Sequence, residues 1–221
     1  MRPLARSVRI TTTLATLGAL ALAPTGAGAQ TAPAPAARPA PPPLRIAASS
    51  FATVEVHLNA RFADGHWYQE DAGLAGPSRI AIAYGQPHAR GRMVEGGLIP
   101  MDTVYRFGAN GATTLHTDAN ITIGTLKIPR GDYSLFLLDG KSGWQLVVNR
   151  QTGQWGTDRD STMDVGRTAL AARTMAEPEE SMTVYLVPES ARPQSGYASL
   201  GGTLRIEWGR TELTAPWTVV Q

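Results

Sequence analysis

Cysteine is absent from the 221 residues of this chain, and apolar segments with helical periodicity are nearly absent too. Without cysteine the protein has no disulfide, no thiolate metal site and no cysteine nucleophile. It also lacks an apolar run of the roughly 18 to 20 residues that a membrane-spanning helix needs. A domain of about 170 residues can bury roughly 70% of its unfolded surface, so a fold without disulfides is feasible.

The first 29 residues have the composition of an export signal. Three arginines and no acid precede an apolar run over residues 10–23, and small residues at 27–29 close it. We expect cleavage after Ala29 and a location in the periplasm or outside the cell. Because the apolar run is too short to cross a bilayer, we expect no membrane span in the mature chain.

An excess of positive charge is also missing once the leader is set aside. The chain has 20 Lys and Arg against 18 Asp and Glu, and its three leader arginines leave 17 basic residues for the mature part. Binding to nucleic acid requires clustered basic side chains that displace counterions. We therefore exclude nucleic acid as a partner.

The mature chain begins with a Pro- and Ala-rich linker at residues 30–48, which prolines keep extended. Residues 49–221 then show short runs of alternating apolar and polar residues between Gly, Pro, Asn and Asp, the pattern of an antiparallel β-sandwich in a single domain. We expect strands at 52–58, 79–84, 113–117, 120–128, 133–138, 144–149, 182–187, 203–208 and 213–219. Residues 59–78 read as a loop-like insertion.

Two local features of these strands lead to specific predictions. Gly209 and Arg210 separate two alternating runs and predict the turn of a C-terminal hairpin. Tyr133 follows a turn over residues 129–132, and in sandwiches such a tyrosine commonly buries its ring and bonds its hydroxyl to a nearby carbonyl.

Familiar catalytic motifs are missing. The sequence contains no G-x-S-x-G, no H-E-x-x-H, no phosphate-binding loop and no G-x-G-x-x-G. The four histidines, at positions 57, 66, 88 and 116, are too far apart in sequence for a local metal pair. We expect no metal and no cofactor, and the carboxylates include no pair that the sequence singles out as acid and base.

Several separated strings resemble one bacterial family. YGQPHARGR, GGLIP, VYRFGANGATTL, IPRGDYSLF, NRQTGQWGT and LRIEW are similar, in that order, to the exported proteins called domain of unknown function (DUF) 2911. The resemblance runs from about Ser49 to Val219. It implies an exported β domain and supplies no catalytic residue. The chain differs from the usual family pattern at Tyr105 and Phe107 and in the insertion at 59–78.

The candidate ligand-binding residues come mainly from the glycine-rich stretch 83–117. They are Arg90, Arg92, Arg106, Asn110, Thr113 and His116, together with Trp155 on a later loop. Guanidinium groups suit carboxylate, phosphate or sulfate, to which Asn110 and Thr113 can add neutral hydrogen bonds. A structural interpretation is also open, in which Arg106 pairs with Asp102 or Glu95.

Two functions remain open. The first is a non-catalytic envelope or extracellular module that binds a small polar or anionic ligand, a glycan or an envelope protein. The alternative is a hydrolase or lyase on envelope material, in which His116 or a carboxylate is the base and the arginines hold an anionic substrate. The enzyme hypothesis predicts that His116 lies within hydrogen-bond reach of the arginines in a concave pocket.

Overall fold

A computed structural model describes residues 43–58, 61–68, 78–189 and 200–220. The chain divides into two compact units, Met1–Leu44 and Arg45–Gln221, and every described strand belongs to the second. Apart from one 3-10 turn, η1 (Ser161–Met163), the regular elements of the described residues are strands. None of the described residues forms a helix long and apolar enough to cross a membrane.

The larger of two main sheets is antiparallel and has seven strands. In spatial order they are β1 (Ser50–His57), β4 (Arg79–Gln86), β6 (Thr113–Thr117), β9 (Gly131–Gly140), β10 (Gly143–Asn149) and β11 (Asp164–Ala169), with β5 (Val104–Arg106) paired to the far part of β9. β5 therefore extends the line of β6 along β9, and a loop over residues 107–112 connects the two strands.

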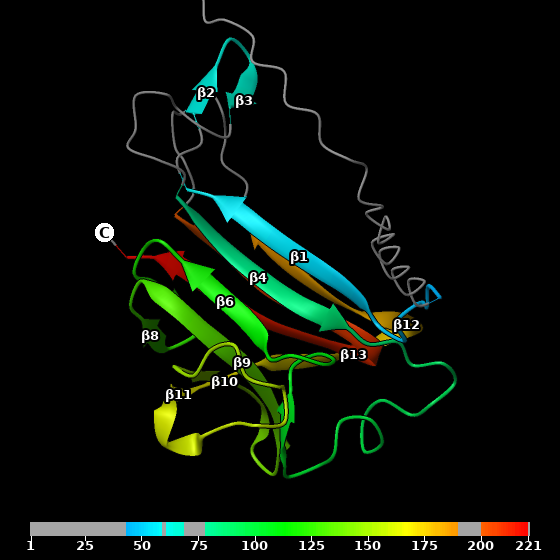
Figure 1. Cartoon of the computed structure of the whole chain (residues 1–221). Coiled ribbons are helices and arrows are strands. Elements are labelled where there is room, and N and C mark those ends of the chain that lie inside the picture. Colours follow the sequence, from blue (N-terminus) through cyan, green and yellow to red (C-terminus); the bar gives the residue numbers. More distant parts are fainter. Residues whose placement is uncertain (1–42, 59–60, 69–77, 190–199, 221) are drawn as a thin grey trace, which may run out of the picture. The chain divides into compact units, whose positions relative to one another are not determined.

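The smaller main sheet has four strands and lies behind the larger one in Figure 1. Its order is β12 (Ala171–Pro188), β13 (Gly201–Val219), β7 (Ile121–Ile123) and β8 (Leu126–Ile128). A separate two-stranded hairpin consists of β2 (Arg61–Ala63) and β3 (His66–Tyr68).

The hydrophobic core lies between the two main sheets. On the larger sheet Ile82 and Leu115 face inward from paired positions, and both are fully buried. The smaller sheet contributes Ile206, Trp208 and Trp217 to the same cluster. Alternate residues of each strand thus fill one shared interior, as expected for stacked sheets. The predicted all-β sandwich is confirmed.

The prediction of a C-terminal hairpin at Gly209 is wrong. β13 runs without a break through Gly209 and Arg210, and both halves pair with the long strand β12. Gly209 has a φ of 59°, and the register between β12 and β13 shifts on both sides of its pair with Glu179. The glycine therefore causes a local irregularity within one strand and not a turn between two strands. A Cβ atom at Gly209 would lie 2.9 Å from the side chain of Val94, so this position also requires glycine for close packing.

Three other predictions have definite outcomes. The expected strand at 120–128 is two strands, β7 and β8, which pair as a hairpin. The expected loop-like insertion contains β2 and β3, whereas residues 59–60 and 69–77 lie outside the described residues. Tyr133 is buried, and its hydroxyl donates to the Pro129 carbonyl at 2.8 Å, as predicted.

Candidate functional site

The segment after β4 carries two of the candidate arginines and crosses to the other sheet. The Ala89 amide donates to the Glu180 carbonyl of β12 at 2.8 Å, and the Met182 amide donates to the Pro87 carbonyl at 3.0 Å. Arg90 and Gly91 then adopt positive φ angles of 51° and 72°, which make a tight turn. These backbone contacts therefore fix the positions from which the Arg90 and Arg92 side chains project.

Arg106 reaches the same region from β5, through the loop over residues 107–112. The Ala109 amide donates to the Gly85 carbonyl of β4 at 2.8 Å. A Cβ atom at Gly85 would lie only 2.0 Å from the Ala109 carbonyl oxygen, so the close approach of this loop requires glycine. Gly156 also lies close to the Arg106 side chain, since a Cβ there would be 2.9 Å from Cδ.

These elements enclose a pocket of about 190 Å³, which we call the arginine pocket. Its lining residues are Ala48, Ser49, Pro87, His88, Arg90, Arg92, Leu98, Tyr105, Arg106, Gly108, Ala109 and Trp208. The structure thus brings together three of the candidate residues, Arg90, Arg92 and Arg106, from two segments of the chain.

The guanidinium groups of this pocket lack acidic partners. Among the residues that the structure describes, no carboxylate forms an ion pair with Arg90, Arg92 or Arg106. The predicted structural pairing of Arg106 with Asp102 or Glu95 is therefore not found within the described ranges. Three guanidinium groups thus line one small pocket, and none has an ion-pair partner in the described part of the chain.

Backbone carbonyls hold the two arginines of the turn. Arg92 donates through Nε to the Ala89 carbonyl at 3.0 Å and through Nη2 to the His88 carbonyl at 2.8 Å. Since a guanidinium has five N–H donors, three have no partner among the described residues. Arg90 donates to the Ala48 carbonyl through Nη2, and its own amide donates to Glu180 Oε1 at 2.7 Å. Because backbone carbonyls are uncharged, these contacts orient the arginine side chains without neutralising their positive charge.

The pocket also contains a tyrosine and a histidine. Burial raises the pKa of Tyr105, although the charge of Arg106, a hydrogen bond from Arg106 and the charge of Arg92 oppose that rise. The neutral hydroxyl donates to the Gly108 carbonyl at 3.3 Å. The His88 ring has Nδ1 2.8 Å from Ser181 Oγ and Nε2 3.2 Å from Ser50 Oγ. Nδ1 therefore contacts a serine of β12 in the smaller sheet, and Nε2 contacts a serine of β1 in the larger sheet.

Three other candidates lie outside the lining of the arginine pocket. Asn110 is exposed, has a φ of 64° and uses its carbonyl to accept from the Gly156 amide, as a turn residue would. Thr113 is fully buried with no hydrogen-bond partner for Oγ1 among the described residues. Trp155 is 52% exposed and forms an isolated bridge with Gly111.

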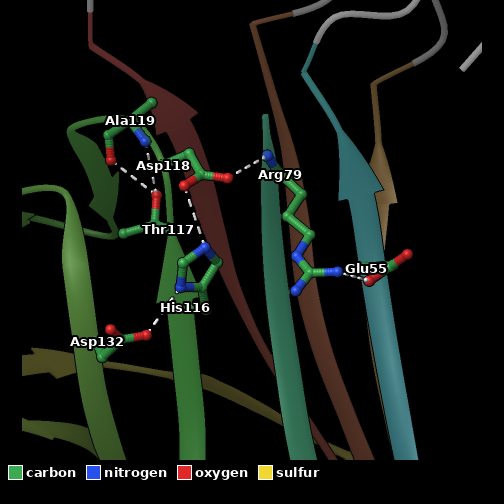
Figure 2. A network of polar contacts seen from close by, with 7 residues as sticks. All are labelled: Glu55, Arg79, His116, Thr117, Asp118, Ala119 and Asp132. Carbon is green, nitrogen blue, oxygen red and sulfur yellow. Dashed lines mark hydrogen bonds and ion pairs between the residues drawn. The ribbon is translucent and has the colours of Figure 1, made fainter. Parts of the chain in front are cut away.

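His116 belongs to a different polar cluster, shown in Figure 2. Its Nδ1 lies 2.8 Å from Asp132 Oδ1, and its Nε2 lies 3.2 Å from Asp118 Oδ1. Asp118 Oδ2 accepts from the Arg79 amide at 2.9 Å, and the Arg79 guanidinium reaches Glu55 at 3.3 Å. We call these five residues the His116 network. His116 does not line the arginine pocket, which the enzyme hypothesis required.

The hydrogen bond to Asp132 raises the pKa of His116, and the charge of Asp118 adds to the effect. Despite these carboxylates, no group of three or more His, Asp or Glu in the described part of the chain is arranged to hold a metal ion. The network is a set of paired charges on the face of the larger sheet that points away from the core.

Comparison with models of known families shows which family the chain belongs to. The family model described as "Protein of unknown function (DUF2911)" matches residues 69–216, more than half of the sequence. The chain belongs to the DUF2911 family. The matched DUF2911 region includes all three arginines of the pocket, whereas β1 precedes it. Searches among curated proteins and among solved structures gave no match.

Sequence reasoning did not identify His88, Tyr105 or Trp208 as lining residues of the arginine pocket. His88 and Tyr105 each lie within two residues of a candidate arginine, in the strings PHAR and VYRF, so proximity in sequence was an available signal. No comparable signal exists for Trp208, which arrives from the last strand and looks like a core residue.

Proposed function

We propose that this DUF2911 protein is a non-catalytic module that binds a small anion in the arginine pocket. The observation that carries the proposal is the group of three guanidinium side chains that line one pocket with no carboxylate partner among the described residues. Positive charges that the protein leaves unpaired are free to attract a carboxylate, phosphate or sulfate, for which the guanidinium fork is well shaped.

The size of the pocket limits the anionic group. A volume of about 190 Å³ suits one phosphate, sulfate or small carboxylic acid, or one acidic sugar residue, and not a long polymer within the pocket itself. The three N–H groups of Arg92 that have no partner among the described residues provide donors toward such a ligand, whereas the Tyr105 hydroxyl donates to the Gly108 carbonyl at 3.3 Å. Charge-assisted hydrogen bonds from several directions favour a tetrahedral or planar oxyanion over a neutral molecule.

The proposal includes export and a non-catalytic role. Residues 1–29 would be removed as a leader, 30–48 would form a tether, and residues from 49 onward would form the binding domain. The hydrolase or lyase alternative names His116 or a carboxylate as the base near the arginines, and His116 is engaged by Asp118 and Asp132 instead. No observation on the described residues favours the alternative.

Titration calorimetry with inorganic phosphate and sulfate tests the proposal directly. We expect binding by the unmodified protein and a loss of tenfold or more in affinity for Arg106→Ala, because a hydrogen bond to a charged group contributes about 1.5 to 3 kcal/mol. Arg130→Ala is the matched control, since Arg130 is exposed on a turn and lines no part of the arginine pocket. Equal affinities in folded Arg106→Ala and Arg130→Ala proteins would contradict the proposed site.

A further inference from the structure

A second cavity adjoins the arginine pocket and has a different chemical character. Its volume is about 500 Å³, and it shares Arg92 with the arginine pocket. The remaining lining residues are Ala89, Gly91, Met93, Val94, Glu95, Pro178, Glu179, Glu180, Gly209 and Arg210. We call it the apolar cavity. Arg92 is therefore a wall common to both spaces.

Aliphatic side chains and glycine form much of this cavity. Val94 is buried, and its side chain packs against the backbone of Gly209 in β13. Met93 is 69% exposed, although a methionine side chain is apolar and adapts its shape readily. Pro178 adds a rigid apolar surface from β12. A hydrocarbon group placed here would leave water and contact carbon atoms on several sides.

The charged residues of the apolar cavity restrict which end of a ligand enters it. Three carboxylates, Glu95, Glu179 and Glu180, line the cavity. Arg92 and Arg210 line it too, so three negative groups face two positive ones. An anionic group is therefore favoured less here than in the arginine pocket, where three guanidinium groups form no ion pair with a carboxylate among the described residues. The two spaces therefore select opposite ends of one molecule.

We propose that the ligand is an amphiphilic anion, with its oxyanion group in the arginine pocket and a short alkyl chain in the apolar cavity. This inference rests on the proposed function and adds the chemical class of the ligand. The shared chemistry is a monoalkyl phosphate or carboxylate, whether it is a free molecule or part of a lipid. Charge orients the molecule, and burial of the chain adds affinity.

A chain-length series on the unmodified protein tests the inference without any mutation. Calorimetric titrations compare inorganic phosphate, n-butyl phosphate and n-hexyl phosphate. We expect affinity to rise roughly fourfold for each added methylene, since burying one CH₂ contributes about 0.8 kcal/mol. Hexyl phosphate, with two more methylenes, should therefore bind about fifteenfold more tightly than butyl phosphate.

Two methionines provide a matched pair of variants. Met93 lines the apolar cavity, and Met101 is similarly exposed, at 66%, but lines neither space. Met93→Ser should reduce the gain from butyl to hexyl phosphate while leaving the affinity for inorganic phosphate unchanged. Met101→Ser should leave both quantities unchanged. Because both side chains are exposed, neither substitution should prevent folding.

The possible results separate the two proposals. Equal affinity for all three phosphates, together with weaker binding in Arg106→Ala, would overturn the inference and leave the anion site intact. No binding of any phosphate would overturn the proposed function and the inference with it. Flotation with phosphatidylcholine vesicles that contain phosphatidic acid distinguishes the source of the chain. Binding to such vesicles supports a lipid source, and a rise along the soluble series without flotation supports a free amphiphile.

Discussion

The arginine pocket and the His116 network are both polar, yet charged side chains are paired in the network and lack ion-pair partners among the described residues in the pocket. In the network, three carboxylates meet one arginine and one histidine, and every member has a partner within 3.3 Å. In the pocket, the guanidinium groups of three arginines form no ion pair with a carboxylate of the described residues, and the one carboxylate contact is from the Arg90 amide to Glu180. The difference teaches that uncompensated charge in a concave space, rather than a concentration of polar residues, distinguishes a candidate binding site from a structural cluster.

Their positions in the fold explain this difference. Strand register pairs His116 of β6 with Asp132 of β9, and Asp118 directly follows β6, so the centre of the network lies on the exposed face of one sheet. The arginine pocket instead forms where the segment after β4 and the loop after β5 meet β12 and β13. Connecting segments at the end of a rigid sandwich are where binding residues are commonly found.

The largest effect should come from Gly85→Ala, which disturbs the backbone contact that positions Arg106. A Cβ atom there would lie 2.0 Å from the Ala109 carbonyl oxygen, and backbone must move to relieve the overlap. We expect the free energy of unfolding to fall by about 3 kcal/mol, measured by urea denaturation. Phosphate affinity should fall as well, while the NMR titration of His116 should stay the same.

Gly111→Ala is the control for this substitution, because it lies in the same loop and has open space around it. The nearest atom to a Cβ at Gly111 is the Gln154 carbonyl oxygen at 4.0 Å, and its φ is not in the left-handed region. A change of less than about 0.5 kcal/mol is expected. Similar losses in both variants would show that close packing at Gly85 does not position the pocket.

A second experiment contrasts removal of one charge from each region. Asp118→Ala should lower the free energy of unfolding by about 1 kcal/mol, because the Arg79 amide and His116 both lose an acceptor. Arg106→Gln should change it by less than about 0.5 kcal/mol, since no described carboxylate depends on that guanidinium. The comparison fails if Arg106→Gln proves the more destabilising of the two in thermal and urea unfolding.

Much of the fold could be predicted from alternation, and the errors have physical causes. Leu204, Ile206 and Trp208 alternate as a half-buried strand should, and all three are in the core. Gly209 looked like a turn because sequence does not reveal that β12 offers partners on both sides of it. β11 was missed because Asp164–Ala169 pairs with β10 while showing no clean apolar alternation.

The candidate site was predicted in part for a similar reason. Arg90, Arg92 and Arg106 line one pocket, because two glycine-rich connections that are close in sequence meet at one end of the sheets. Alternation in β6 places Thr113 and His116 on opposite faces, so the two could not serve one pocket. That inference was available from the spacing of three residues. The contributions of β12 and β13 depended on tertiary contacts that local patterns do not contain.

The smallest effect concerns the pH dependence of stability that His116 confers. Its pKa is raised in the folded protein, by the hydrogen bond to Asp132 first and by the charge of Asp118 in addition. Folding therefore favours the protonated ring, and this contribution is fully present below the unfolded pKa of about 6.5 and is lost as pH rises through the higher folded pKa. The side chain is 36% exposed, so solvent screening limits the contribution to about 0.5 kcal/mol.

The measurement is the free energy of unfolding of the unmodified protein and of His116→Gln at about pH 5.5 and about pH 8.5, on either side of the transition. The unmodified protein should hold its advantage at the lower pH and lose most of it at the higher pH. Asp132→Asn provides the control, because it removes the main cause of the raised pKa and should flatten the difference. An advantage that grows with pH would mean that the neutral ring is the stabilising form, and the His116 network would then not be a set of compensated charges.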